Sequence, residues 1–416
     1  MSRGYYTITR ITDYGPYVTK IVLPFPAEVT AAEVSAEQFT VSVDRMDDRG
    51  ETLLLPKSWM ALDDKEPSQG EIPVVKAYPS DLEGNELAKG DCVTLEMAYG
   101  PLYPLSAGIS APAGLNVCIK TRYTITVNGA GQSGLCYDFP LGNCSPDAYG
   151  FLNAAASGEN GLRYGYYVPQ QVADSPRPLI IWLHGAGEGG VDPTVAYTGN
   201  KVVALISEKV QAIFGGAYVL VPQTPTFWMN DGSGQYGHTG KSMYTAALKA
   251  CIDEFISKNP GIDRDRIYVG GDSNGGFMTM RMSIDYPDFF AAAFPVCEAL
   301  YDAAITDAQI DDIKHLPIWF THAKNDPVVK PDETVVPTYK RLVAAGNRNV
   351  HFTYWDNIKD IHEGFKDADG NPFEYIGHFA WIPMLNDDCK LDFDGKPVTV
   401  NGKEVSLLEW LSMQKK

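Results

Sequence analysis

One segment decides the fold of this chain: Arg266-Ile-Tyr-Val-Gly-Gly-Asp-Ser-Asn-Gly-Gly-Phe-Met278. Its apolar start predicts a β-strand, and the residues after Ser273 are compatible with a helix that ends before Pro287. Between strand and helix lies the pattern G-x-S-x-G, which places a serine on a sharp turn. The two glycines leave room where strand and helix come closest. The segment therefore predicts that Ser273 is a nucleophile whose hydroxyl is exposed at the start of a helix.

The strand before Ser273 belongs to a series of apolar runs that alternate with amphipathic segments. The runs lie at 179–183, 218–221, 267–269, 291–296, 318–320 and 350–354. Between the second and the third, residues 242–257 carry apolar side chains on one helical face, and Pro260 bars continuation. This alternation predicts a mostly parallel sheet with helices on both faces. In such sheets, ligands bind at the carboxyl ends of the strands.

A serine hydroxyl is a poor nucleophile at neutral pH, so it needs a histidine base and a carboxylate. In proteins with this kind of serine turn, both residues come later in the chain than the serine. Two loop histidines qualify, His362 and His378. We favour His378, because a glycine precedes it and a segment containing Trp381 follows that can hold its ring. His362 remains the alternative. The histidines that flank or lie in strands are predicted to be structural: His315, His322 and His351.

The carboxylate is expected at the end of another strand. The apolar run 318–320 leads into a turn that contains Asp326, which places this side chain at the same sheet edge as the serine. The order Ser, Asp, His along the chain is the one found in folds that carry such a serine turn. Asp302 and Asp332 are competitors, and an Asp before a proline can by itself cap a turn.

Backbone amides are needed to stabilise the oxygen of a tetrahedral intermediate. The turn 184–190 after the strand at 179–183 is rich in glycine and offers several of them. We expect one donor from the amide of Asn274 and the other from Ala186 or Gly187. No G-K-[ST] or G-x-G-x-x-G pattern is present, so this turn does not predict a nucleotide site.

Residues near other strand ends are candidates for the substrate pocket: Gln223, Trp228, Glu298 and Trp381. For the aromatic residues, wedging a loop onto the core is an equal alternative. The Asp-rich turns at 367–370 and 392–395 lack the full spacing of a calcium loop. The sequence therefore predicts neither a metal nor a cofactor.

The first third of the chain has a different texture. Short alternating or β-branched runs lie at 17–23, 39–43, 72–78, 92–97 and 123–127, separated by Pro, Gly, Asp and Asn. This pattern predicts a small antiparallel β-sandwich. The expected domains are the sandwich at 1–134, a linker at 135–150 and the α/β domain at 151–416.

Composition narrows the function further. Lys and Arg number 34 against 52 Asp and Glu, a net charge of −18, which disfavours nucleic acid and anionic membranes as partners. No apolar run is long enough to insert into a membrane. Seven scattered cysteines predict thiols in a reducing compartment, although Cys136 and Cys144 can be paired if the protein is exported. The expected location is cytoplasmic as the sequence stands, or secreted if a leader was removed. Whether the protein forms a homo-oligomer stays open.

Four segments together resemble a known family: IIWLHGAGEGG (180–190), YVGGDSNGGFMTMRM (268–282), WFTHAKNDPVV (319–329) and YIGHFAWI (375–382). They resemble the α/β-hydrolase esterases of the predicted-peptidase and polyhydroxybutyrate-depolymerase-like group, especially members with an N-terminal immunoglobulin-like domain. The resemblance is strong over 162–386 and extends to the first third in layout alone.

This resemblance implies an α/β-hydrolase fold preceded by an immunoglobulin-like β-sandwich. It also implies a carboxylic-ester hydrolase in which Ser273, Asp326 and His378 form the triad, with an oxyanion hole near Ala186, Gly187 and Asn274. The implied substrate is a small-molecule or polysaccharide-linked ester.

One residue departs from the family pattern, and three alternatives stay open. Asp272 stands where relatives usually have a small or uncharged residue. A carboxylate there would favour the protonated imidazole, so we expect activity shifted to alkaline pH. The same triad also serves a serine peptidase, or a feruloyl or acetyl esterase whose first domain binds polysaccharide. A non-catalytic binding protein of the same fold is the third alternative.

Overall fold

The computed structural model describes residues 2–46, 53, 55–58, 61–110, 114–128, 134–158, 161–170 and 175–416. The chain divides into two compact units, Met1–Tyr149 and Gly150–Lys416. No helix among these described residues is long and apolar enough to cross a membrane.

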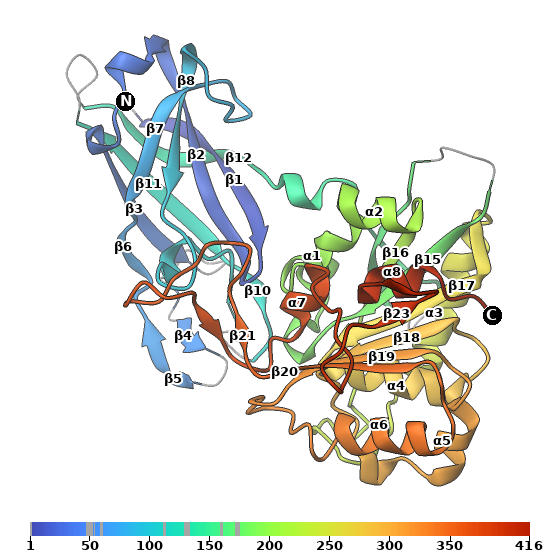
Figure 1. Cartoon of the computed structure of the whole chain (residues 1–416). Coiled ribbons are helices and arrows are strands. Elements are labelled where there is room, and N and C mark those ends of the chain that lie inside the picture. The colour runs from blue at the N-terminus through green and yellow to red at the C-terminus, as the bar shows by residue number, and fades with distance from the viewer. Residues whose placement is uncertain are drawn as a thin grey trace. The chain divides into compact units, whose positions relative to one another are not determined.

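The first unit is built on one eight-stranded sheet (Figure 1). Its strands are β1 (Ser2–Thr12), β2 (Gly15–Thr30), β3 (Phe39–Met46), β6 (Gln69–Glu71), β7 (Val74–Ser80), β8 (Lys89–Met97), β11 (Lys120–Val127) and β12 (Cys136–Cys144). Short elements complete the unit: β4 (Leu55–Ser58), β5 (Ala61–Glu66), β9 (Ile109–Ser110), β10 (Val117–Cys118) and the 3-10 turns η1 (Ala31–Glu33), η2 (Ala36–Gln38), η3 (Pro104–Ser106) and η4 (Pro146–Ala148). The strand order is β6-β3-β11-β12-β1-β2-β8-β7.

This sheet curls around its own core, because β3 and β7 are in contact although they are distant in the strand order. Alternate residues of β3 point inward, including Val41 and Val43, as a half-buried strand requires. The hydroxyl of Tyr5 accepts the backbone N–H of Tyr123 at 2.9 Å inside the core. The predicted immunoglobulin-like sandwich is thus present, with one difference: β1 and β12 pair in parallel.

The stretch predicted as a linker, 135–150, contains a strand. Its residues Cys136–Cys144 form β12, which pairs with β1 and β11 in the sheet. Within β12, Tyr137 alone is fully buried, and three consecutive exposed residues break the alternation that marks a strand in sequence. The strand was missed in sequence for this reason, and because Pro140, Gly142 and Asn143 are residues typical of a connection.

The pairing of Cys136 with Cys144 left open by the sequence is wrong for this fold. The two residues begin and end β12, and strand residues advance about 3.3 Å each, which puts them roughly 20 Å or more apart. A disulfide requires Cα atoms within about 7 Å. Both thiols are free, and no disulfide joins any cysteines of the described chain.

The second unit contains the predicted mostly parallel sheet (Figure 1). Its strands are β13 (Leu152–Ala155), β14 (Arg163–Tyr167), β15 (Arg177–Leu183), β16 (Tyr218–Gln223), β17 (Ile262–Asp272), β18 (Ala292–Val296), β19 (Ile318–Ala323) and β20 (Val350–Trp355). The order is β13-β14-β16-β15-β17-β18-β19-β20, and all strands from β16 to β20 are parallel.

Helices cover both faces of this sheet. They are α1 (Pro193–Thr198), α2 (Glu208–Phe214), α3 (Thr245–Lys258), α4 (Asn274–Asp285), α5 (Asp307–Ile313), α6 (Val335–Ala344), α7 (Trp381–Leu385) and α8 (Leu407–Ser412). Shorter elements are η5 (Ala186–Glu188), η6 (Val202–Ile206), η7 (Asp302–Ala304), β21 (Ile358–Lys359), β22 (Glu374–Tyr375), β23 (Thr399–Val400) and β24 (Lys403–Glu404). Helices α2 and α8 pack together on one face, while α4, α5 and α6 lie on the other (Figure 1).

The strand register sets where the functional loops meet. Leu183 pairs with Gly271, Asp272 with Val296, and Val296 with Thr321, so β15, β17, β18 and β19 end at the same level. The loops that leave these four strands therefore lie side by side at one edge of a rigid sheet. All residues predicted for the catalytic chemistry are in or next to these loops, except His378, which lies in the loop before α7.

Candidate active site

Ser273 lies on the strained turn that the G-x-S-x-G pattern predicted. It joins β17 to α4 with φ 54° and ψ −111°, a conformation that non-glycine residues rarely adopt. Its N–H donates to the carbonyl of Val296 at 2.9 Å, and its own carbonyl accepts from Phe277 at 2.9 Å. The side chain is half-buried. Backbone strain of this kind is typical of functional turns.

The glycines of this turn are required mainly by the neighbouring strand. A Cβ on Gly275 would lie 1.8 Å from the carbonyl oxygen of Leu183, at the end of β15, and one on Gly271 would lie 2.3 Å from the same atom. The Gly271 position is also 2.9 Å from the carbonyl carbon of Gly275, the strand-to-helix contact expected from the sequence. The tight turn thus depends on three segments rather than two.

His378 and Asp326, predicted as base and orienter, are hydrogen-bonded. The Nδ1–H of His378 donates to Oδ2 of Asp326 at 2.8 Å, and both side chains are almost fully buried. The ring of Trp381 stands edge-on to the imidazole, with centroids 5.8 Å apart. A Cβ on Gly377 would lie 2.1 Å from Oδ1 of Asn325, so the glycine before His378 lets the two loops touch.

The carboxylate of Asp326 has four donors. Its Oδ1 accepts the backbone amides of Val328 at 2.8 Å and Val329 at 3.0 Å, and its Oδ2 accepts from His322 Nε2 at 3.0 Å as well as from His378. Burial raises the pKa of Asp326, but the hydrogen bonds from the two imidazoles outweigh it and hold the pKa well below its usual range. The group is therefore a carboxylate at neutral pH.

His322 is the site residue that sequence reasoning missed. It was expected to be structural because it lies in β19, yet its ring contacts Asp326 directly. The signal available in sequence was its spacing, four residues before Asp326 at the end of a strand. Asp302 and Asp332, the competing carboxylates, are placed elsewhere: Asp302 binds Arg341 at 2.8 Å.

The turn expected to supply amides is η5, which follows β15. Ala186 and Gly187 are half-buried, and the first amides of such a turn have no partner within it. His184 supports the turn: its Nδ1–H donates to the carbonyl of Gly185 at 2.6 Å, and its Nε2 accepts from the amide of Thr224 at 3.1 Å. Burial lowers the pKa of His184 to about 4, so the ring is neutral.

Gln223 lies behind this turn rather than in a pocket. Its Nε2 donates to the carbonyls of Glu188 and Asp192, each at 2.9 Å, and the residue is 1% exposed. The predicted role in substrate contact gains no support from this position, because the amide group is engaged in holding the backbone.

Asn274 contributes more than its backbone. It is the first residue of α4, where amides lack a helical partner, and its side-chain Oδ1 accepts the amides of Trp228 and of Met229, the latter at 3.3 Å. The loop after β16 is thereby fixed next to the serine. Beyond this anchor the loop closes on itself, since Met243 N–H donates to the carbonyl of Asn230 at 2.8 Å.

Trp228 is fully buried, with its ring centroid 5.1 Å from that of His184. Glu298 is also buried; its Oε2 accepts from Leu300 N–H at 2.7 Å, and burial raises its pKa to about 8. Both lie near the strand ends as predicted, but their burial favours the packing alternative. His362, the alternative base, pairs with Asp388 at 2.8 Å instead.

Asp272, the residue on which the alkaline-shift hypothesis rests, is buried beside Asn200 and Glu188. Its Oδ2 accepts from Asn200 at 3.0 Å, and a Cβ on Gly185 would lie 2.6 Å from Asp272 Oδ2 and 2.9 Å from Glu188 Oε2. Burial and the neighbouring Glu188 raise the pKa of Asp272 well above its usual value. A carboxyl whose pKa is raised in this way is a weaker source of an alkaline shift than the ionised carboxylate that the hypothesis assumed.

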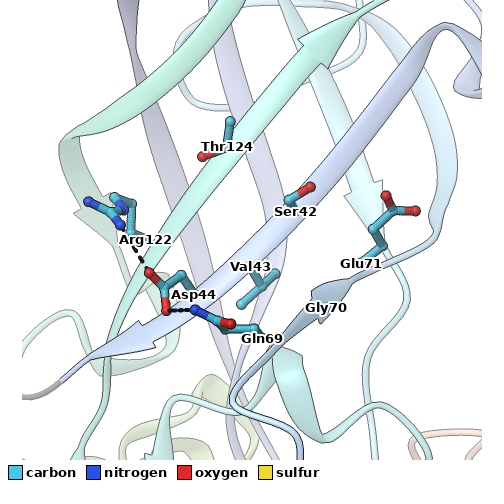
Figure 2. A pocket seen from close by; sticks show the side chains of 8 residues that line it. All are labelled: Ser42, Val43, Asp44, Gln69, Gly70, Glu71, Arg122 and Thr124. Atoms are coloured by element: carbon cyan, nitrogen blue, oxygen red, sulfur yellow. Dashed lines mark hydrogen bonds and ion pairs between the residues drawn. The ribbon is translucent and has the colours of Figure 1, made fainter. Parts of the chain in front are cut away.

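A separate, shallow concavity of about 350 Å³ lies on the first unit (Figure 2). It is lined by polar groups of β3, β6 and β11, and Asp44 accepts from Arg122 at 2.9 Å and from Gln69 at 3.1 Å. No aromatic side chain lines it among the residues placed by the structure. Within the same described ranges, no three His, Cys, Asp or Glu side chains gather as a metal site.

The second unit is an α/β hydrolase. Helices cover both faces of its parallel sheet, and a strained serine turn is followed along the chain by an aspartate and then a histidine. Residues 4–134 match the family model of the esterase Ig-like N-terminal domain, and residues 227–334 match that of the prolyl oligopeptidase family. The predicted resemblance to α/β-hydrolase esterases with an immunoglobulin-like domain is thus confirmed.

A solved structure titled as a thermostable esterase has the same fold, with a TM-score of 0.74 and 24% identity, covering 99% of this chain and 100% of that one. Among curated proteins, feruloyl esterase B of Neurospora crassa is 32% identical over 33% of this chain and 44% of its own length. Acetylxylan esterase A of Emericella nidulans is 26% identical over 37% and 49%, respectively. Poly(3-hydroxyalkanoate) depolymerase C of Paucimonas lemoignei is 30% identical over 30% and 29%. The chain spans less than half the length of these curated relatives.

Proposed function

We propose that this protein is a serine carboxylesterase that works through an acyl-enzyme. The observation that carries the proposal is the bond of 2.8 Å between His378 and Asp326, formed at the sheet edge where Ser273 occupies its strained turn. A serine, a histidine and a carboxylate at one edge are what hydroxyl activation requires. A protein that only binds a ligand has no need of all three.

The chemistry follows from the hydrogen bonds. Because Nδ1 of His378 donates to Asp326, Nε2 is the basic nitrogen, which takes the proton of Ser273 as its oxygen attacks the ester carbonyl. The carboxylate then stabilises the imidazolium. The proton passes to the departing alcohol, and water repeats the sequence on the acyl-enzyme.

The amide of Asn274 and that of Ala186 or Gly187 are the proposed donors to the tetrahedral oxygen. Leu183, which precedes the η5 turn, is packed against Gly275 of α4, so the two sources of amides are adjacent. Loss of one such donor typically costs about 10²–10³ in rate.

Esters are the proposed substrates, and peptides the second candidate. The curated relatives cited above are an esterase of feruloyl groups, an esterase of acetylxylan and a polyester depolymerase, which favours small-molecule or polysaccharide-linked esters. The match of residues 227–334 to the prolyl oligopeptidase family is the observation that keeps a peptidase in view.

A polysaccharide-binding role of the first domain has weaker support. The shallow concavity on β3, β6 and β11 presents paired polar groups without an aromatic ring on which a sugar could stack (Figure 2). A pull-down on insoluble polysaccharides by residues 1–149 tests this role. Oligomeric state, cellular compartment and the exclusion of nucleic acid stay predictions.

The decisive experiment labels the full chain with a fluorophosphonate probe and identifies the modified residue. We expect modification at Ser273, its loss in Ser273→Ala and His378→Ala, and its retention in His362→Ala, whose ring pairs with Asp388. A panel of p-nitrophenyl esters, feruloyl esters and peptide anilides then separates esterase from peptidase. Absence of labelling in the wild-type protein would contradict the proposal.

A further inference from the structure

Two imidazoles share one carboxylate oxygen. His378 Nδ1 lies 2.8 Å and His322 Nε2 lies 3.0 Å from Oδ2 of Asp326, while the amides of Val328 and Val329 occupy Oδ1. An ionised carboxylate has about four acceptor positions. Those of Asp326 are therefore filled, and its orientation toward His378 is set by the three other donors.

The proton of His322 lies on Nε2. This nitrogen faces two acceptors, Oδ2 of Asp326 and the carbonyl of Val329, each at 3.0 Å. Nδ1 of the same ring is buried and has no partner among the residues that the structure describes. A proton there would be a buried donor without an acceptor, so the ring donates through Nε2.

Packing alone does not explain a histidine at this position. His322 is fully buried in β19, where an apolar side chain fills the same space without leaving a polar nitrogen unsatisfied. Buried polar groups with an unsatisfied atom are uncommon in folded proteins and call for an explanation at the site where they occur. The bond to Asp326 supplies one.

We propose that His322 is a positioning residue of the proposed triad, which holds the Asp326 carboxylate in line with His378 and withdraws charge from the shared oxygen. This inference rests on the proposed function. Because β19 is paired on both sides, by β18 and β20, the His322 ring is held rigidly. It can therefore fix the position of Asp326, which lies on a turn. A shared oxygen stabilises an imidazolium less than an unshared one does, because its charge is divided between two donors.

The consequence is a defined pH response. Among the described residues, the titratable groups around the Asp326 carboxylate are His322 from β19, His378 from the loop before α7, and the thiol of Cys297 just after β18, which interacts electrostatically with it. Without the bond from His322, Oδ2 carries more charge and favours the protonated form of the base. The acidic limb of kcat/KM should then move to higher pH.

Two amide variants test this. Gln at position 322 places an N–H where Nε2 lies, whereas Asn is too short to reach Asp326. For His322→Asn we expect kcat on p-nitrophenyl acetate to fall roughly 10- to 100-fold with KM nearly unchanged, and the acidic limb to rise by about half a pH unit. His322→Gln should restore most of kcat and return the limb to its wild-type position.

His351→Leu is the matched control. It removes a ring on the adjacent strand β20 that bonds another carboxylate, Asp392, at 2.7 Å, and should leave the limb in place. If the His322→Asn variant does not fold, His322→Leu replaces it. Thermal unfolding verifies the native folding of each variant.

Equal activity and equal pH profiles in the Asn and Gln variants would overturn the inference. So would a Gln variant as impaired as the Asn variant. If the wild-type chain neither hydrolyses the ester nor reacts with the fluorophosphonate, the proposed function itself has failed, and the variants are not needed to show it.

Discussion

The side-chain oxygen of Asn274 accepts the backbone amide of Trp228, and so ties the loop after β16 to the residue that follows the proposed nucleophile. Met229 shares the same acceptor at 3.3 Å. Asn274 thus has two separate tasks, one for its side chain in placing the loop and one proposed for its backbone amide in catalysis. The two can be separated by substitution.

Asn274→Ala should lower the free energy of unfolding by about 1–3 kcal/mol, because it leaves two buried amides without an acceptor. Asn274→Asp keeps the acceptor and should preserve stability, but it places negative charge beside the developing oxyanion and should lower kcat. Urea unfolding and steady-state kinetics on both variants check this. Equal stability of the Ala variant and the wild type would contradict the anchoring role.

Gly275→Ala should prevent native folding of the second unit or abolish activity. The added methyl group would lie 1.8 Å from the carbonyl oxygen of Leu183, which is backbone and cannot move aside. Gly142→Ala on β12 is the control, since its methyl group would meet only the Tyr6 ring at 3.4 Å. Soluble yield, circular dichroism and ester hydrolysis are the measurements. An active Gly275→Ala enzyme would show that the turn is looser than described.

Asp272→Asn should leave the acidic limb of kcat/KM where it is. The pKa of Asp272 is raised well above its usual value by burial and then by Glu188, and Oδ2 of Asp272 accepts from Asn200, so we expect the substitution to change the charge near the base little. The pH profile of ester hydrolysis for both proteins is the test. A limb that moves to lower pH in the variant would revive the hypothesis of an alkaline shift.

Glu298→Gln should gain stability relative to the wild type as pH rises. The pKa of Glu298 is raised by burial to about 8 in the folded state, against about 4.3 when unfolded. The folded state therefore binds the proton more tightly, and wild-type stability falls by about 1.4 kcal/mol per pH unit between these two values. Glutamine does not titrate and removes this slope.

Urea unfolding at several pH values within that window measures the effect, with Glu404→Gln, at an exposed position, as the control. Parallel curves for wild type and Glu298→Gln would mean that the carboxyl is solvated in solution.

Thiol titration of the denatured, unreduced protein should find all seven cysteines reactive, because no disulfide joins the described cysteines and the ends of β12 lie too far apart for one. In the native protein, the buried thiols of Cys92, Cys251, Cys297 and Cys389 should react slowly. A count of five after denaturation would indicate a bridge that this fold does not accommodate.

The residues of the proposed triad can be chosen from sequence because each belongs to a recognisable local pattern. A serine on a strained turn needs flanking glycines, and an aspartate at a strand end and a histidine after a glycine complete a known order. The parallel strands β15 to β20 could be predicted for a similar reason, since strands buried on both faces are continuous apolar runs and all of these but the edge strand β20 are of that kind.

Other features could not be predicted, because they depend on contacts between distant segments. The His322 ring bonds Asp326 only because the turn after β19 brings that carboxylate within hydrogen-bond distance of the ring. Trp228 is held in its buried position by the hydrogen bond from its backbone N–H to the side chain of Asn274, which is 46 residues away. β12 is recruited by β1, at the opposite end of the domain sequence, and its own residues show little alternation.

The loop from Asn230 to Met243 is closed by its own hydrogen bond and anchored beside the serine turn. Both of its ends are pinned, by the bond between these two residues and by the anchor on Asn274, so length and composition in between can change without displacing the serine turn. Longer loops add little entropic cost once their ends are fixed. Exchanging this loop between relatives therefore tests whether it contributes to ester preference while the serine turn stays in place.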